Sequence, residues 1–512
     1  MSEPPLPGAK ALERRAALLL VAALTLLRLV ALFRSPLELY PDEAQYWLWS
    51  RTLDFGYYSK PPVIAWAIWA TTALGGDTEP WVRLSATLFQ AAATLLVFAV
   101  ARRVYGAASG LAAAALYGLM PGIQLSSLVA ATDAPLLFAL GLSLYAYVAL
   151  QVAQARARIG WAAAFGAALG LAFLSKYAAA FYLSGIALHL ILSRSARTAW
   201  TPAAILAGVS AGFLIILPNL AWNAAHGFAT FQHTAANAAW SGVQLFNPGE
   251  LAGFLTGQFG VFGPIPMGVL VAGCWLAWRR RTLDPRDLML LCFTLPPLAI
   301  VTGQAFISRA NANWSGAGYL AGAILVAAWM VRWRTRRWLI AAITLQAAVA
   351  TLFLLGVSQP DLADRIGLAN GLKRARGWAE ATDLILDRAA REPGLSAIAV
   401  NNRFLFYAVS YYGRERLGPG APPLASWLLM GGPRNQAETT APLTPALGRR
   451  VLMVSYEGWR RAEMEADFTR ARDLEIVSVW LDPRHKRRVE MFVGERFSPR
   501  PRDPLSGLPT PP

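Results

Sequence analysis

An acid pair and a lysine next to two prolines are the residues best suited to chemistry in this sequence. Asp42 and Glu43 lie in an aromatic-rich run, and Lys60 directly precedes Pro61-Pro62. A carboxylate can accept a proton from an attacking hydroxyl group, and a compact ammonium can hold a phosphate. Both motifs follow the first hydrophobic segment, so we expect them at a membrane surface, where they could bind a lipid-linked phosphate and activate an acceptor.

These residues also have structural alternatives. Asp42 and Glu43 would stabilise the start of a helix over residues 42–51, where negative charge is favoured, but this accounts for only one of the two acids. Lys60 could reach lipid headgroups. A cation is not favoured at a helix amino terminus, however, and a bound phosphate would explain it better. We predict Asp42 and Glu43 as catalytic candidates, Lys60 as a phosphate ligand and Tyr58 as a substrate contact.

Three further positions carry charge beside apolar segments. Asp133 lies in a tight turn before Pro135, where it could cap the next helix as well as serve a site. Lys176 lies where two short apolar segments meet, and an ionisable group at such a depth indicates function. Arg309 stands at the start of another apolar segment, where it could bind phosphate in bidentate geometry or anchor in headgroups. We predict Lys176 and Arg309 as donor-phosphate ligands and Asp133 as a substrate-binding residue.

The distribution of lysines along the sequence supports a functional role for Lys60 and Lys176. Five of the 47 basic residues are lysines, which leaves 42 arginines. Lys60 and Lys176 are the two lysines that fall between the first and last apolar segments. An arginine-rich chain that uses lysine at these two points indicates a need for a compact ammonium there.

The histidines and cysteines give weaker signals. His226 and His233 share one loop, and their spacing of seven could place both on one helix face lining the acceptor site. No further ligands for a metal are evident, so we assign none; no cofactor is certain, and a divalent cation stays an alternative. Cys274 and Cys292 lie in apolar runs and fit neither a disulfide framework nor a metal site.

Composition indicates a polytopic membrane protein. The 512 residues are 55% hydrophobic and 15% charged, whereas soluble domains have roughly 25% charged residues. The net charge of +17 comes from arginines in short clusters between apolar runs. Such clusters are a topology signal and not a nucleic-acid-binding stripe. The first apolar run lacks a cleavage site and is interpreted as a retained helix.

Eleven apolar segments are candidate spans, for which about 20 apolar residues are needed. They are residues 16–34, 82–101, 107–130, 134–153, 160–175, 177–193, 200–222, 251–278, 287–307, 314–331 and 338–357. Arginine clusters fall at every second junction, and the positive-inside rule places them all in the cytoplasm. The clusters are Arg14-Arg15, Arg102-Arg103, Arg156 with Arg158, Arg194 with Arg197, Arg279 to Arg281, and Arg332 to Arg337.

This alternation fixes the remaining topology. Residues 61–74 cannot span without inverting every later cluster, so we interpret them as an interfacial or re-entrant helix. The outer loop 35–81 then holds two helices along the membrane, and the carboxyl-terminal region lies outside. Most acids before residue 358 fall on the outer face, which indicates that this face carries the chemistry.

The last 155 residues predict a small α/β domain. Residues 372–391 and 456–471 are expected to be helical, residues 396–400 and 450–455 to be strands, and residues 474–481 and 486–493 to form a hairpin. We divide the chain into a membrane domain at 1–357, an α/β domain at 358–497 and a disordered tail at 498–512. No nucleotide-binding fingerprint is present.

Five motifs together resemble the GT-C glycosyltransferases of the PMT_2, or glycosyltransferase family 39, type. They are residues 40–62, 131–135, 173–177, 218–233 and 309–314. That group includes lipid A aminoarabinose transferases, RgtA/B/C/D-like transferases and protein O-mannosyltransferases. The resemblance covers about residues 15–350 and implies a polytopic helical fold and a polyprenyl-phosphate-linked sugar donor used on the periplasmic face. It also implies that Asp42 is the base and that Lys60 and Lys176 are donor-phosphate ligands.

Two departures refine the resemblance. Ser59 stands where aminoarabinose transferases often have an acid before Lys-Pro, and no arginine follows His233 until Arg279. The RgtA/B/C/D-like branch therefore fits better.

The sequence thus predicts an inverting glycosyltransferase of the bacterial inner membrane, with its active site and α/β domain in the periplasm. Its expected partners are a polyprenyl-phosphate-sugar, membrane lipids and a lipid or glycan acceptor such as lipid A, and no nucleic acid. The alternatives are a flippase or transporter for a lipid-linked sugar, a protein O-mannosyltransferase and an envelope-assembly scaffold. A flippase needs a continuous polar route, and the one-sided placement of the acids favours the enzyme.

Overall fold

The computed structural model describes residues 7–238, 246–281, 283–367, 369–430, 432–456, 458 and 460–503. The chain divides into two compact units. The helical unit comprises Met1–Arg34, Asp54–Gly56 and Lys60–Leu355, and the α/β unit comprises Ser35–Leu53, Tyr57–Ser59 and Gly356–Pro512. The sequence placed the whole segment 35–59 in the membrane domain, whereas most of it belongs to the α/β unit.

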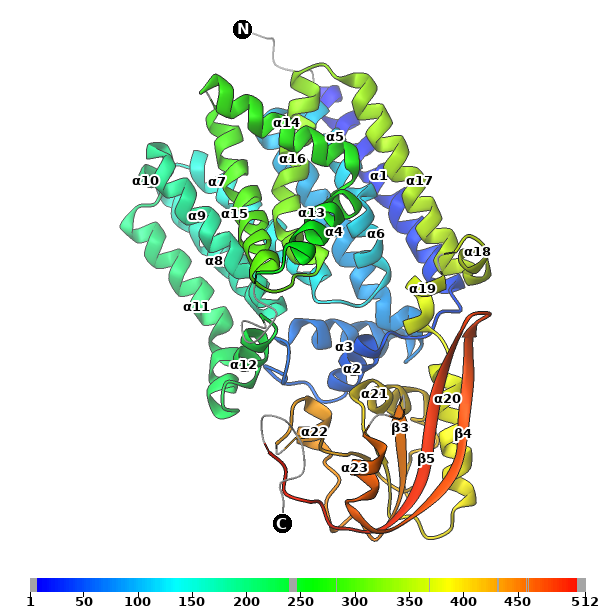
Figure 1. The fold of residues 1–512 in the computed structure, drawn as a ribbon. Coiled ribbons are helices and arrows are strands. Elements are labelled where there is room, and N and C mark those ends of the chain that lie inside the picture. Colours follow the sequence, from blue (N-terminus) through cyan, green and yellow to red (C-terminus); the bar gives the residue numbers. More distant parts are fainter. Residues whose placement is uncertain are drawn as a thin grey trace. The chain divides into compact units, whose positions relative to one another are not determined.

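The helical unit is built almost entirely of helices (Figure 1). They are α1 (Pro7–Arg34), α3 (Val63–Gly75), α4 (Glu79–Tyr105), α5 (Ala107–Leu119), α6 (Pro121–Leu128), α7 (Asp133–Val152), α8 (Ala155–Ser175), η1 (Tyr177–Ala179), α9 (Ala180–Leu192), α10 (Arg194–Ala199), α11 (Pro202–Ala225), α12 (Ala229–Ala236), α13 (Pro248–Phe262), α14 (Pro264–Arg280), α15 (Pro285–Ile307), η2 (Ala312–Ser315), α16 (Gly316–Arg332) and α17 (Arg336–Ser358). Within the described residues, eight helices are long and apolar enough to cross a membrane, or up to ten if each of two bent pairs is one span.

Bends divide two of the predicted spans into pairs of helices. Residues 107–130 form α5 and α6, which meet at 59°, and residues 251–278 form α13 and α14, which meet at 111°. Proline lacks the N–H that continues a helix, and Pro121 and Pro264 each follow a break. Gly263 has a φ of +98°, a conformation that suits glycine. The predicted span 251–278 is therefore a sharply bent pair of helices, which is either a broken span or a re-entrant loop, and Tyr177–Leu192 is shorter than the helices that qualify as spans.

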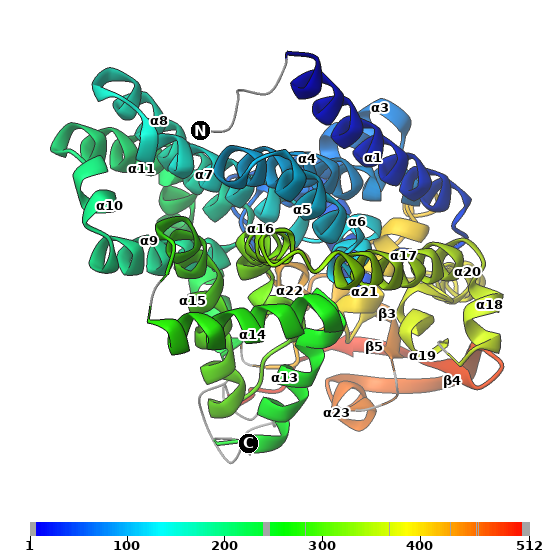
Figure 2. The same ribbon diagram turned by 90° about the horizontal axis from the view of Figure 1, so that it is seen from above.

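Helix α16 forms the centre of the helical unit. It packs against α4, α5, α7, α14 and α15, and the view from above shows it surrounded by other helices (Figure 2). Its alanine-rich sequence allows this close approach, because small side chains let helix backbones come together. The buried residues of these helices form one continuous apolar core.

A glycine seam joins α8 to α11. Gly166 and Gly170 on α8 face Gly208 and Gly212 on α11, and a Cβ atom on Gly166 would collide with the carbonyl oxygen of Gly208. This small-xxx-small pattern is typical of closely packed membrane helices. Both helices lie side by side in Figures 1 and 2. The seam fixes the carboxyl-terminal end of α8 relative to α11.

The α/β unit contains a five-stranded sheet. Its elements are α2 (Pro41–Ser50), α18 (Pro360–Arg365), α19 (Ala369–Leu372), η3 (Lys373–Ala375), α20 (Trp378–Arg391), β1 (Ala397–Val400), α21 (Arg403–Tyr412), β2 (Leu424–Ser426), α22 (Gln436–Thr440), β3 (Arg450–Tyr456), α23 (Arg461–Glu465), β4 (Phe468–Asp482) and β5 (His485–Phe497). The strand order is β2-β1-β3-β5-β4. Strand β1 is parallel to β2 and β3, whereas β5 is antiparallel to β3 and β4.

The predicted strands and hairpin are confirmed, but the helix at 456–471 is wrong. Only Arg461–Glu465 is helical there, and β4 already begins at Phe468. The early part of β4 is charged and exposed, and it is held by its ladder with β5. A polar edge strand lacks the alternation that would distinguish it from a helix. The predicted tail, 498–512, lies mostly outside the described residues.

The predicted helix near residues 42–51 is present as α2, and it packs on α21. Trp47 of α2 meets the ring of Tyr411 edge-on, with 4.9 Å between ring centroids. The backbone N–H of Leu39 donates to the Tyr412 hydroxyl at 2.7 Å. These contacts explain why this part of the first loop belongs to the α/β unit.

Candidate active site

An ion pair between Asp133 and Lys176 is the centre of the candidate site in the helical unit. The Lys176 ammonium donates to a carboxylate oxygen of Asp133 at 2.9 Å. Helices α7 and α8 are antiparallel neighbours with a two-residue link, so the start of α7, with Asp133, lies beside the end of α8, with Lys176. The side chains of Asp133 and Lys176 are 21% and 20% exposed, respectively. The bond uses one of the three N–H donors of the ammonium, and the others can meet phosphate oxygens.

Backbone geometry places Lys176 at a joint between helices. Its φ of −165° and ψ of 136° end α8 and precede η1. Its N–H donates to the carbonyl of Ala172 at 2.9 Å, and its carbonyl accepts from Ala179 at 3.0 Å. Two hydrogen-bonded helix ends therefore hold this lysine in place.

A buried polar network lies next to Lys176. The Tyr177 hydroxyl donates to Asn219 at 2.9 Å, and the Asn223 amide donates to the Tyr177 hydroxyl at 3.2 Å. Both asparagines are buried in the apolar helix α11. The Asn219 amide also donates to the carbonyl of Phe55 at 2.6 Å. Polar groups in such a helix need partners, and these bonds tie α11 to the region around Lys176.

The segment Asp54–Gly56 is the second anchor of α11. The Asp54 carboxylate accepts from the Trp222 indole at 2.7 Å, and its carbonyl accepts from the Trp66 indole at 2.9 Å. A Cβ atom on Gly56 would collide with the ring of Trp222. Glycine at this position therefore lets the loop lie directly against the indole.

Lys60 is placed in the helical unit just before α3. It is half-buried, and Pro61 and Pro62 lead into the first turn of α3. Helix α3 packs on α4 and α8. A short apolar helix is thus present over Val63–Gly75, and Lys60 stands at its amino-terminal end, as expected.

The histidine loop departs from the predicted geometry. His226 ends α11, whereas His233 lies on the separate helix α12. Gly227 and Phe228 between them both have positive φ angles. The exposed His226 ring stacks on Trp222 with 4.0 Å between centroids, and His233 is half-buried. The two histidines therefore do not share one helix face.

Arg309 lies in the turn between α15 and η2. Its side chain is exposed, and its carbonyl accepts from the Gln304 amide at 3.1 Å. The backbone of this turn is thus fixed, while the guanidinium points to the surface of the unit. Within the described residues, no group of three or more His, Cys, Asp or Glu side chains could hold a metal ion.

The remaining predicted residues belong to the α/β unit. The Asp42 carboxylate is 58% exposed and accepts from Arg403 at 3.1 Å. Arg403 also donates to Gln45 at 2.7 Å, and the Gln45 amide donates to the Ser59 hydroxyl at 3.3 Å. Arg403 is a residue that the sequence did not single out. It fixes the Asp42 carboxylate yet leaves other lone pairs of that carboxylate accessible.

Glu43 and Tyr58 are more enclosed than Asp42. Glu43 is fully buried and accepts from the backbone N–H of Tyr40 at 2.8 Å, as in a capping box. This geometry favours the structural alternative for Glu43. The Tyr58 N–H donates to Gln436 at 2.8 Å, and its hydroxyl donates to the carbonyl of Pro433 at 3.2 Å. Burial, followed by the nearby Glu438 carboxylate, raises the pKa of Tyr58.

Sequence reasoning missed Asp54, Asn219, Trp222 and Asn223 as site residues. One signal could have revealed the asparagines: they are four residues apart in an otherwise apolar helix, so they share a face. The pairing of Asp54 with Trp222 joins positions 168 residues apart and had no local signal.

Comparisons with known proteins identify relatives of this chain. The family model described as dolichyl-phosphate-mannose-protein mannosyltransferase matches residues 59–222. The lipid A galacturonosyltransferase RgtD of Rhizobium johnstonii is 37% identical over 409 residues, which cover 78% of this chain and 83% of that protein. The chain belongs to this glycosyltransferase family.

Solved structures share the fold of this glycosyltransferase. ArnT from Cupriavidus metallidurans in the apo state has a TM-score of 0.64 at 18% identity, covering 96% of this chain and 99% of that one. The same protein bound to undecaprenyl phosphate has a TM-score of 0.62 at 20% identity, covering 92% and 97%. The glycosyltransferase is a multi-pass membrane protein of the GT-C type with a small carboxyl-terminal sheet domain. The predicted fold class and family are confirmed.

Proposed function

We propose that this glycosyltransferase transfers a sugar from a polyprenyl-phosphate donor to lipid A or a related envelope lipid or glycan, with inversion. The reaction takes place on the periplasmic face of the bacterial inner membrane. Two observations support the substrates: the 37% identical relative is named a lipid A galacturonosyltransferase, and an ArnT of the same fold was solved with undecaprenyl phosphate. A hexuronic acid is therefore the first donor sugar to test, ahead of a pentose.

The single observation that carries the proposal is the half-buried Asp133–Lys176 pair at the joint of two helices. Lys176, with Lys60 and Arg309, binds the donor phosphate and neutralises the charge that develops on it as the sugar leaves. Asp133 keeps the Lys176 ammonium oriented. The polar network around Tyr177 and Asn219 holds the lysine-bearing joint rigid.

The chemistry proceeds by direct displacement. An acceptor hydroxyl oxygen forms a bond to the anomeric carbon, while the bond from that carbon to the phosphate oxygen breaks and its electron pair leaves with the phosphate. The Asp42 carboxylate takes the hydroxyl proton. Arg403 orients that carboxylate through the 3.1 Å contact. Tyr58, His226 and His233 are proposed substrate contacts, and Glu43 shapes the start of α2.

The test is transfer of labelled hexuronic acid from a purified polyprenyl-phosphate donor to lipid A by the full chain in detergent. A flippase gives no product there, so absence of product contradicts the proposal. Asp42→Asn is expected to retain donor binding and to lose turnover by roughly a hundredfold or more. The matched control is Asp383→Asn, which removes a similarly exposed carboxylate paired to Arg416 in the same unit. Normal turnover by Asp42→Asn would refute its assignment as the base.

A further inference from the structure

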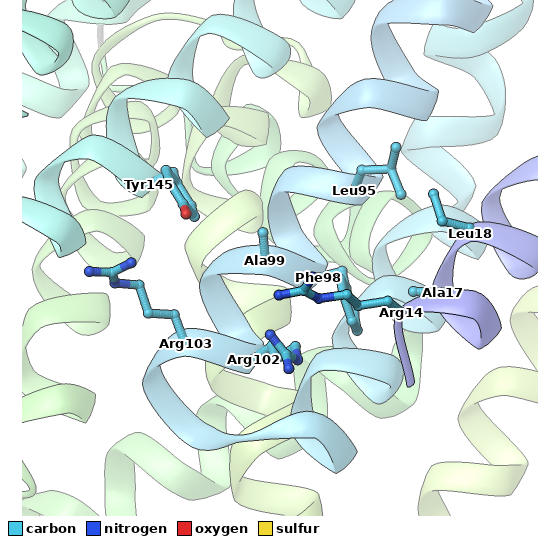
Figure 3. A pocket seen from close by; sticks show the side chains of 9 residues that line it. All are labelled: Arg14, Ala17, Leu18, Leu95, Phe98, Ala99, Arg102, Arg103 and Tyr145. Atoms are coloured by element: carbon cyan, nitrogen blue, oxygen red, sulfur yellow. The ribbon is translucent and has the colours of Figure 1, made fainter. Parts of the chain in front are cut away.

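A cleft of about 530 Å³ opens among α1, α4 and α7 in the helical unit. Figure 3 shows its lining side chains: Arg14, Ala17 and Leu18 from α1, Leu95, Phe98, Ala99, Arg102 and Arg103 from α4, and Tyr145 from α7. The cleft lies at the end of the unit where α4 finishes, and its residue Tyr145 is twelve residues, or about 18 Å, from Asp133 along α7. Helix α4 has 27 residues, which corresponds to a length of about 40 Å. Thr87, near its other end, donates to the carbonyl of Ser127 close to the turn before Asp133.

The polar side of the cleft is cationic. Arg14, Arg102 and Arg103 contribute three positive charges, and the Glu13 carboxylate, 3.5 Å from Arg102, offsets one, which leaves a net charge of +2. The Nε atom of Arg102 is buried and lies 3.5 Å from Glu13 Oε2, which is ion-pair distance without hydrogen-bond geometry. The guanidinium of Arg103 lies 5.9 Å from the ring centroid of Tyr145.

The other side of the cleft is apolar and continues onto the outer surface of α1. Phe98 and Ala17 are buried and pack on Ala114. Leu18 is exposed, and so is its neighbour Leu19. The cleft thus presents guanidinium groups at one end and a hydrocarbon wall leading into the lipid-facing surface of α1 at the other. This distribution matches an amphiphile with a phosphate headgroup and acyl chains.

We propose that this cleft binds one anionic phospholipid of the cytoplasmic leaflet. The phosphodiester lies between Arg14 and Arg102, and an acyl chain follows Leu18 and Leu95. Two features favour this occupant: the arginine clusters place this end of the unit in the cytoplasm by the positive-inside rule, and basic pockets between membrane helices on that side bind anionic headgroups. The bound lipid links α1 to α4 and α7. This site does not depend on the proposed sugar transfer.

The test is native mass spectrometry of the full chain in detergent, titrated separately with phosphatidylglycerol and phosphatidylethanolamine. Phosphatidylglycerol is expected to bind more tightly. Arg14→Gln with Arg102→Gln should reduce that affinity about 25-fold, at about fivefold for each arginine near an anionic headgroup. The matched control, Arg279→Gln with Arg280→Gln, removes the same charge from another predicted cytoplasmic arginine cluster, at the end of α14, and should retain the affinity. An equal loss of phosphatidylglycerol affinity in the two double variants would show that only the general surface charge matters and would overturn the site.

A second variant tests the space inside the cleft independently of its charge. Ala99→Trp fills the cleft without changing any charge, so it should also weaken phosphatidylglycerol binding at least tenfold, while a monodisperse elution profile reports correct folding. Unchanged binding by that variant contradicts the site. Two competition outcomes also contradict it: displacement of phosphatidylglycerol by inorganic phosphate alone, and selective retention of polyprenyl phosphate, which would make the cleft a donor site.

Discussion

Two aspartate ion pairs stand at opposite ends of the helical unit, and they differ in how completely their carboxylates are used. Asp287 accepts from Tyr105 at 2.8 Å, from Trp329 at 2.8 Å, and from both terminal nitrogens of Arg332 at 2.7 and 2.9 Å. Asp133 accepts one side-chain bond, from Lys176, in the described structure. The Asp287 side chain is 4% exposed, whereas Asp133 retains contact with the surface.

This difference distinguishes a structural pair from a pair that can receive a ligand. Four hydrogen bonds satisfy the carboxylate of Asp287, so it can offer little to a substrate. The pair of Asp133 and Lys176 keeps unused lone pairs and N–H donors beside a surface. Arginine suits the first arrangement because its planar group binds both oxygens, and lysine suits the second because its ammonium can turn toward a new partner.

The largest expected effect is on catalysis by Lys176. Lys176→Met removes the ammonium with little change in length, and it should lower turnover a hundredfold to a thousandfold, or about 2.7–4 kcal/mol of transition-state stabilisation. Steady-state transfer of labelled sugar measures the loss. Lys486→Met, which removes an exposed lysine of the α/β unit, should leave turnover unchanged. If Lys176→Met worked normally but unfolded at lower temperature, the pair would be structural and the comparison would fail.

Arg332→Met should act on stability instead. The buried Asp287 carboxylate then loses two charge-assisted hydrogen bonds, and the expected cost is about 3 kcal/mol in the free energy of unfolding. Unfolding in detergent, followed by tryptophan fluorescence, measures it, with the exposed Arg337→Met as control. Adding Asp287→Asn to Arg332→Met should restore part of the stability, because the unpaired charge is gone. A turnover defect in protein of normal stability would contradict this assignment.

These two ion pairs show how much of the site could be predicted from the sequence. Asp133 and Lys176 were each predicted, and their meeting follows from a two-residue link between two antiparallel helices. The helix break at Gly263 was missed because the apolar run continues through it, although the glycine precedes two nearby prolines. The grouping of α2 with α21 rests on contacts across more than 350 residues, such as Asp42 with Arg403. No local pattern encodes such contacts.

Asp133→Asn should have a smaller effect than Lys176→Met. The amide can still accept from the ammonium, so Lys176 is misdirected but not removed, and turnover should fall about tenfold, equivalent to about 1.4 kcal/mol. A double-mutant cycle with Lys176→Met measures the coupling between the two residues. Because we propose that Asp133 acts by positioning Lys176, its loss should have little further effect in the Lys176→Met background. Fully additive losses would mean that Asp133 acts on substrate independently.

The smallest effect concerns a third carboxylate, which extends the comparison to the α/β unit. Glu392 is paired with Arg388, Arg450 and Arg472, and hydrogen bonds, first from Arg472, hold its pKa below the ordinary value of 4.5. A carboxylate with a lowered folded-state pKa stabilises the fold above its unfolded pKa, and that stability is lost as the pH falls through the folded value. Stability of this unit should therefore decrease below about pH 4.5.

Glu392→Gln should lower stability at pH 7 by about 1 kcal/mol and flatten part of the acid dependence. Hydrogen exchange of peptides from β1 and β3 at pH 7 and pH 4 measures both changes. Asp387→Asn, which removes an exposed partner of Arg416, serves as the control. An acid dependence that is identical in Glu392→Gln and the unmodified chain would show that this saturated carboxylate does not govern acid stability.

The glycine seam between α8 and α11 has a consequence for mutational tolerance. Gly166 is ten residues from Lys176, or about 15 Å along the helix, and an alanine there must push α11 away from α8. In a saturation library selected for activity, inactivating substitutions should therefore form two stripes of four-residue period far from any reacting atom. Those stripes would be intolerant even to a single added methyl group, while the lipid-facing residues between them would accept almost any apolar replacement.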